Sequence, residues 1–134
     1  MTPDVREVRL PLGLLGFEAM KDYSLVTKPG EEPFYWLRVR ENPGLAFVVL
    51  DPFLVAPDYH PDIPQPDVEF LGLTSPGDAL LYSIVTLHSP VRATLNLKGP
   101  LVLNCRTWVG KQVIISNAAD YSVQHPLPLD GRPT

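Results

Sequence analysis

The chain lacks the features that stabilise small secreted proteins or anchor a protein in a membrane. It contains one cysteine, Cys105, so no disulfide can form within the chain. Its first residues lack the basic start and apolar stretch of a secretory signal. The longest uncharged apolar runs, such as residues 45–50, fall far short of a membrane span. These absences predict a cytoplasmic, soluble protein with no membrane partner.

Basic residues are missing from the middle of the chain. No Lys or Arg occurs from Glu41 to Val91, although the net charge of the whole chain is only −4. The acids of this stretch are Glu41, Asp51, Asp58, Asp62, Asp67, Glu69 and Asp78. A face with one sign of charge repels phosphates, so we expect no direct binding of nucleic acid and favour a basic protein partner. The alternative is that the acidic surface only maintains solubility.

Proline is abundant, with 16 residues, which leaves little room for a helical protein. No long helical period is present, so a βαβ parallel sheet is excluded. Short apolar or alternating runs between turn residues are typical of antiparallel strands. We expect strands at residues 5–10, 23–27, 34–39, 45–50, 79–87, 91–97, 101–105 and 112–115. The sequence therefore predicts an all-β, mainly antiparallel fold. We expect a compact, β-barrel-like single domain over residues 1–134, with at most one or two short helical turns.

The segments between these strands carry their own signals. Residues 51–66 hold five prolines and should form an edge or a surface loop, because proline cannot donate to a strand ladder. Residues 67–71 fit one helical turn, with Pro66 near its start and Gly72 or Gly77 at its end. Residues 109–111 are expected as a turn, and about 125–134 as a flexible tail.

Residues that could carry chemistry are sparse. Asp58, His60 and Asp62 would share one side of an extended chain and are ligand types that zinc accepts, but no second His or Cys cluster accompanies them. Cys105 follows an apolar run, as packed and unreactive cysteines do. No Gly-x-Ser-x-Gly or Gly-x-Gly-x-x-Gly motif occurs. We therefore expect no enzyme, no cofactor and no metal, with metal-assisted hydrolysis as the less favoured alternative.

Aromatic residues suggest where a partner would bind. Phe34 and Trp36 lie in an expected strand and are predicted to belong to the core. Phe53 and Tyr59 lie in the proline-rich segment, and aromatic anchors beside acids are common at protein interfaces. The predicted partner-binding residues are Phe53, Asp58, Tyr59, Asp62 and Asp67.

Several segments, taken in order, resemble the FliW family. They are Gly13-Leu14-Leu15-Gly16-Phe17-Glu18, residues 33–37, Asp51-Pro52-Phe53-Leu54 with Pro57-Asp58-Tyr59, residues 94–104, Gly110-Lys111-Gln112, and residues 121–127. Together they span nearly the whole chain. Leu15, Gly99 and Gln124 depart from the Pro, Ala and Arg that many members have there, and Gln124 removes a charged group.

The resemblance implies a β-barrel-like fold without catalysis. FliW proteins bind two partners in alternation, flagellin and CsrA. CsrA is a small basic repressor of flagellin translation. Export of flagellin frees FliW to take up CsrA and relieve the repression, so the resemblance predicts a partner switch. The acidic segment would then lie near the surface that binds CsrA. A generic β-barrel adaptor or chaperone for another protein is the alternative.

Overall fold

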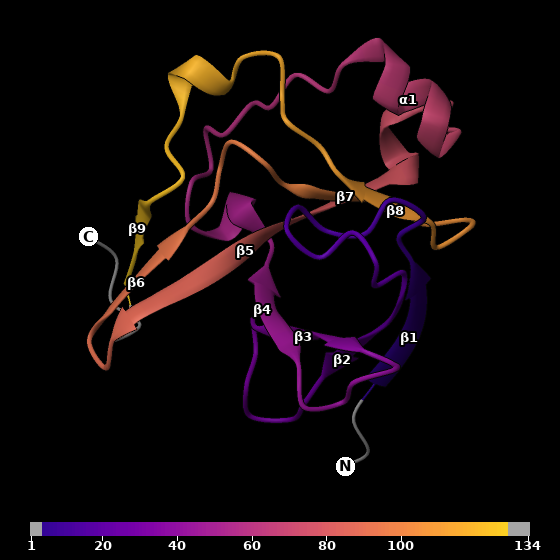
Figure 1. Ribbon diagram of the computed structural model, residues 1–134. Helices are drawn as coiled ribbons and strands as arrows, with labels where there is room; N and C mark the ends of the chain where they lie inside the picture. Colours follow the sequence, from indigo (N-terminus) through magenta and orange to yellow (C-terminus); the bar gives the residue numbers. More distant parts are fainter. Residues whose placement is uncertain (1–3, 129–134) are drawn as a thin grey trace.

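The computed structural model describes residues 4–128, and nine strands occur within that range (Figure 1). The first four are β1 (Asp4–Arg9), β2 (Asp22–Thr27), β3 (Tyr35–Val39) and β4 (Ala46–Leu50). The other five are β5 (Ala79–Ser89), β6 (Arg92–Leu95), β7 (Leu101–Asn104), β8 (Gly110–Gln112) and β9 (His125–Leu127). One helix, α1 (Gln65–Leu71), lies between β4 and β5. The prediction of an all-β fold with little helix is confirmed.

Every ladder between these strands is antiparallel. The sheet follows the order β1-β2-β3-β4-β5-β6-β9, while β7 pairs with β5 and β8 with β7. No ladder joins β8 to β1. Instead, Arg9 and Val109 form a single parallel bridge, and Arg9 N donates to Trp108 O at 3.0 Å. The sheet is therefore curled like a barrel but keeps an open seam.

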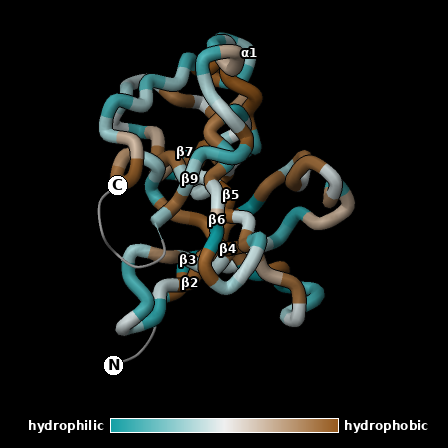
Figure 2. The backbone as a smooth tube through the Cα atoms, turned by 90° about the vertical axis from the view of Figure 1, so that its left-hand side faces the viewer, coloured by the Kyte–Doolittle hydropathy of each residue, from teal (hydrophilic) through white to brown (hydrophobic). Residues whose placement is uncertain are grey.

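Strand β5 joins two parts of the molecule. Its 11 residues pair first with β7, over Ala79 to Tyr82, and then with β6 from Val85 onward. Figure 1 shows the β5–β6 hairpin extending away from the curled part of the sheet. Separate apolar clusters fill the two parts, one around Tyr23, Leu37 and Leu103 and the other around Tyr59, Leu95 and Leu97. Figure 2 shows hydrophobic residues along the central strands and hydrophilic residues in many outer loops.

Helix α1 forms where the sequence predicts a helical turn. Pro66 lies in the first turn, where a missing N–H costs no hydrogen bond, and Asp67 adds a favourable negative charge there. Gly72 ends the helix in the left-handed conformation, with φ of 67°. The helix starts at Gln65, slightly earlier than predicted. It is too short to cross a membrane, and no other α-helix occurs in residues 4–128.

Two expectations near the C-terminus differ from the structure. The sequence predicts a turn at residues 109–111 and a strand at 112–115, whereas β8 covers Gly110–Gln112. The sequence also predicts a flexible tail from residue 125, whereas β9 pairs with β6. Leu127 explains this pairing because its side chain is buried in the second cluster. An edge strand also tolerates Pro126. Residues 129–134 lie outside the described range.

Gly110 occupies a strand because its neighbours leave no room for a side chain. A Cβ there would overlap Leu103 Cδ2 and lie 2.9 Å from Val102 O. We expect Gly110→Ala to lower the free energy of unfolding by about 2 kcal/mol, as overpacking does. Urea denaturation would measure this loss. Gly77→Ala is the control, since nothing lies within 4 Å of its added Cβ. Equal stability losses for the two variants would contradict the prediction.

Candidate partner-binding surface

The proline-rich segment after β4 is held by hydrogen bonds from side chains. The Asp51 carboxylate accepts from Phe53 N at 2.9 Å and caps a short 3-10 turn over Pro52–Leu54. Tyr59 OH then donates to Leu97 O at 2.6 Å, which ties the segment to the core. These bonds give the segment a fixed path although its prolines cannot join a ladder.

Asn117 fixes the next part of the same segment. Its Nδ2 donates to His60 O at 2.8 Å, and its Oδ1 accepts from Asp62 N at 2.9 Å. His60 N also donates to Tyr121 OH at 2.8 Å. The amide of Asn117 thus pairs with the backbone as a neighbouring strand would. The carboxylates of Asp58 and Asp62 therefore extend from an ordered backbone.

The two aromatic residues predicted to meet a partner, Phe53 and Tyr59, lie side by side with ring centroids 5.7 Å apart, but only Tyr59 is buried. Tyr59 is only 4% exposed and belongs to the second apolar cluster, where its ring and that of Tyr121 form a T-shaped pair. Burial raises the pKa of Tyr59 well above its ordinary value. Phe53 is 40% exposed, and neighbouring Leu54 is 62% exposed. Assigning Tyr59 to the surface is therefore a wrong prediction, whereas Phe53 is available for contact.

The acids of the middle segment fall into two groups. Asp58 and Asp62 are exposed, and neither has an ion-pair partner in residues 4–128. Asp67 instead is buried and paired with Lys111, which also lies over the ring of Phe70. Asp67, which was predicted to contact a partner, therefore forms an ion pair inside the protein with a residue 44 positions away in the sequence.

Asp78 is the second acid neutralised by a distant cation. Its Oδ1 lies 3.2 Å from Arg106 Nε. Hydrogen bonds from the backbone and hydroxyl of Thr74 lower the pKa of Asp78 below its ordinary value, with Arg106 contributing less. The acidic stretch is thus not a uniform negative face. Five of its seven acids, Glu41, Asp51, Asp58, Asp62 and Glu69, have no ion-pair partner within residues 4–128, and three of these five lie in the proline-rich segment.

In the part of the chain that the structure describes, the predicted ligand residues do not gather into a metal site. Within the described range, no three His, Cys, Asp or Glu side chains lie together as metal ligands, and Asp58, His60 and Asp62 do not converge. Cys105 is half-buried just beyond the end of β7, with Sγ 3.5 Å from Gly77 O.

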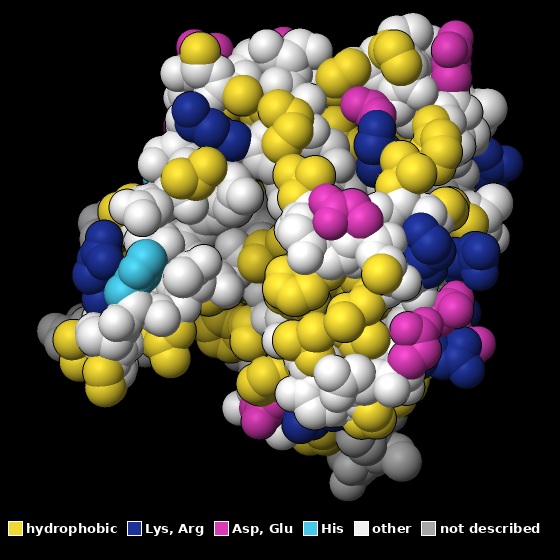
Figure 3. Space-filling view, in the orientation of Figure 1, with side chains coloured by type: hydrophobic (Ala, Val, Ile, Leu, Met, Phe, Trp, Pro, Cys, Tyr) yellow, Lys and Arg dark blue, Asp and Glu magenta, His cyan; other side chains and the backbone are white. Residues whose placement is uncertain are grey.

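A second exposed surface comes from the loop between β1 and β2, where the sequence indicates only a bend. Figure 3 shows hydrophobic side chains gathered near the centre of one face, where this loop lies in Figure 1. Leu12, Leu15 and Phe17 are 49%, 57% and 36% exposed. Gln112 holds the loop by accepting from Leu15 N at 3.0 Å. Because Gln112 is far along the chain from this loop, no local sequence pattern predicts the contact.

Comparisons with known proteins agree with this architecture. The family model described as FliW protein matches residues 2–127. The flagellar assembly factor FliW of Leptospira biflexa is 40% identical over 109 residues, covering 80% of this chain and 71% of the relative. That of Thermotoga neapolitana is 37% identical over 117 residues, covering 86% and 78%.

A solved structure extends the similarity to three dimensions. The crystal structure of the flagellar assembly factor FliW superposes with a TM-score of 0.82 at 33% identity. The alignment covers 94% of this chain and 88% of the other. Sequence and fold thus match over nearly the same residues, and this chain belongs to the FliW family.

Proposed function

We propose that this protein is a non-enzymatic, cytoplasmic flagellar assembly factor that binds flagellin and, alternately, the translational repressor CsrA. Membership of the FliW family supports the flagellar role. The observation that supports a surface for CsrA is the proline-rich segment. There, exposed Phe53 and Leu54 follow β4, and unpaired Asp58 and Asp62 come a few residues later.

The two kinds of side chain would act on different steps of binding. Carboxylates attract a basic protein and raise its association rate, an effect that salt screens. Exposed apolar side chains lose contact with water on docking and slow dissociation. The fixed backbone around Tyr59 and Asn117 reduces the conformational entropy lost on binding. Once CsrA is docked, the same carboxylates would repel RNA phosphates beside it.

The switch between partners follows from mass action. Flagellin and CsrA would each stabilise a different complex of the same protein, so the more abundant free partner occupies it. Export of flagellin lowers its cytoplasmic concentration and shifts the protein to CsrA. No catalytic step is required.

Titration calorimetry tests this proposal directly. The purified protein is titrated with CsrA and with flagellin of the same organism, separately and in competition. Binding of both, with one displacing the other, is the expected result. Binding of neither by the folded protein would overturn the proposal and favour an adaptor for another protein.

Charge reversal tests the surface proposed for CsrA. We expect Asp58→Lys with Asp62→Lys to slow CsrA association about tenfold at low salt and to weaken its salt dependence. Asp67 is left unchanged because its reversal would break the ion pair with Lys111. Stopped-flow mixing at several salt concentrations measures the rate.

The control for charge reversal carries the same charge change elsewhere. Asp4→Lys with Glu31→Lys alters exposed acids on β1 and on the loop after β2, both outside the acidic stretch of residues 41–91. We expect this control to slow association much less. An equal effect of both pairs would show that net charge alone matters and would remove the specific surface from the proposal.

A further inference from the structure

The second half of the chain carries a charge pattern opposite to that of the middle. No Asp or Glu occurs from Ala79 to Ala119, and the basic residues there are Arg92, Lys98, Arg106 and Lys111. Arg106 forms an ion pair with Asp78, and Lys111 forms one with Asp67. Arg92 and Lys98 have no ion-pair partner within residues 4–128. Arg92 is exposed on β6, so its guanidinium is available to an external carboxylate.

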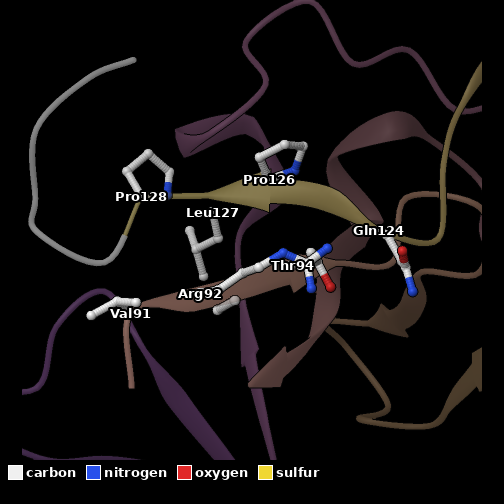
Figure 4. Close-up of a pocket in the computed structure, with 8 residues that line it drawn as sticks. Val91, Arg92, Thr94, Gln124, Pro126, Leu127 and Pro128 are labelled. Atoms are coloured by element: carbon white, nitrogen blue, oxygen red, sulfur yellow. The ribbon is translucent and has the colours of Figure 1, made fainter. Parts of the chain in front are cut away.

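Arg92 also lines a hollow of about 240 Å³ over the paired strands β6 and β9. Figure 4 shows Val91, Arg92 and Thr94 on or beside β6, with Pro126 and Pro128 across the hollow and Gln124 beside one end. We call this hollow the β6–β9 pocket. It combines polar donors, from Arg92 and Gln124, with apolar walls from Val91 and the two prolines.

The size and walls of the β6–β9 pocket restrict its ligand. Its volume is below the roughly 300 Å³ at which small-molecule sites begin, which suits one or two peptide side chains. Pro126 has no N–H, so an incoming strand cannot extend the sheet through a donor there. Val91 is 84% exposed and offers apolar surface next to Arg92. The ligand would therefore be held by its side chains and not by strand pairing.

Nucleic acid fits the pocket less well than a peptide. Binding of nucleic acid draws on several cations for the phosphates and commonly on aromatic rings for the bases. The pocket has one Arg and no aromatic lining residue. Thr94 Oγ1 is engaged with His88 Nε2 at 2.7 Å, which leaves Arg92 and Gln124 as the polar contacts. Arg and a carboxylate match in both charge and geometry.

We propose that the β6–β9 pocket binds an extended acidic segment of a protein partner. One Asp or Glu side chain pairs with Arg92, while an apolar side chain beside it packs against Val91, Pro126 and Pro128. This site goes beyond the proposed function, since its charge is opposite to that of Asp58 and Asp62. The two sites share no residues, so a substitution in one leaves the other in place.

Nuclear magnetic resonance titration of the full chain with two matched peptides tests this proposal. The probe is the blocked peptide Gly-Ser-Leu-Asp-Leu-Ser-Gly, and its control has Asn in place of Asp. We expect the Asp peptide to shift the backbone amides of Arg92, Thr94 and Leu127. We also expect it to bind about fivefold more tightly than the Asn peptide, which is the scale of an exposed ion pair.

Variants of the protein then assign the preference to one residue. Arg92→Gln should abolish the difference between the two peptides, whereas Gln124→Arg should increase it. Lys98→Gln is the matched control, because it removes a cation of the same acid-free stretch that does not line the pocket. This control should leave the fivefold difference unchanged.

Three results would overturn the proposal. One is equal affinity for the Asp and Asn peptides. Another is that inorganic phosphate or a short RNA shifts the same amides and neither peptide does, which would indicate an anion or nucleic-acid site. The third is peptide binding only by a chain shortened to end at Pro128, which would mean that residues 129–134 occupy the pocket themselves.

Discussion

Tyr59→Ala should lower the free energy of unfolding by about 4 kcal/mol, as deletion of a buried aromatic ring does. The ring is 4% exposed and packs in the second cluster, against Tyr121 at 4.8 Å between centroids. Removing it would leave a cavity and also delete the donor to Leu97 O. Because the segment from Asp51 to Asp62 has few ladder bonds, this anchor supports much of its fixed path. Urea denaturation followed by tryptophan fluorescence would measure the loss.

Tyr59→Phe separates the hydroxyl from the ring. It keeps the packing but leaves Leu97 O without its partner, so we expect a loss of about 1.5 kcal/mol. Phe53→Ala is the comparison variant: its ring is 40% exposed but packs 5.7 Å from the ring of Tyr59, so we expect a loss of about 1.5 kcal/mol, well below that of Tyr59→Ala. If Phe53→Ala were as costly as Tyr59→Ala, the assignment of one ring to the surface and the other to the core would be wrong.

The cost of Tyr59→Ala decides how the partner surface can be studied. A binding defect in this variant would mix lost contact with lost structure. Leu54→Ala changes an exposed side chain, and Phe53→Ala removes a partly exposed ring that packs 5.7 Å from the ring of Tyr59. Both variants keep the hydrogen bond from Tyr59 OH to Leu97 O. These two substitutions are therefore the ones that report on contact with CsrA or flagellin.

Local patterns predicted most of the fold. Apolar runs and alternation mark β1 to β7 because each strand buries at least part of one face, whatever its partner is. The position of α1 follows from Pro66 and Gly72, which act within one turn. The sequence pattern predicts a turn in place of β8, because a glycine such as Gly110 is typical of turns when its neighbours in space are unknown. Only the tertiary structure shows Leu103 and Val102 against it.

The candidate surface was less predictable because its charges are set by distant residues. The sequence counts Asp67 and Asp78 among unpaired acids, but Lys111 and Arg106 neutralise them after folding. Burial of Tyr59 likewise depends on Leu97, 38 residues away. Prolines do restrict strand pairing, but hydrogen bonds from side chains replace it. The count of unpaired acids is correct for Asp58 and Asp62, which remain exposed and without an ion-pair partner in residues 4–128.

Asn104→Ala should lower the free energy of unfolding by about 3 kcal/mol. Asn104 is 1% exposed at the end of β7, and its Nδ2 donates to Leu71 O at 2.8 Å. Its Oδ1 accepts from Arg106 N at 2.8 Å. Alanine would leave the buried Leu71 O without its donor, at a cost of about 1–3 kcal/mol. The partly buried Arg106 N would also lose its acceptor, at a smaller cost. The same side chain thus joins the end of α1 to the turn before β8.

Two further variants identify which bonds carry this loss. Asn96→Ala is the matched control, because Asn96 Oδ1 accepts only from nearby Lys98 N and Gly99 N, so we expect a loss of about 1 kcal/mol. Asn104→Asp keeps the oxygen that accepts from Arg106 N, but it replaces the donor to Leu71 O with a second acceptor oxygen. A loss for Asn104→Asp close to that for alanine would show that the bond to α1 dominates. Equal losses for Asn96→Ala and Asn104→Ala would instead mean that this link contributes nothing beyond a local turn. The position of α1 would then depend on the Asp67–Lys111 ion pair and on apolar packing.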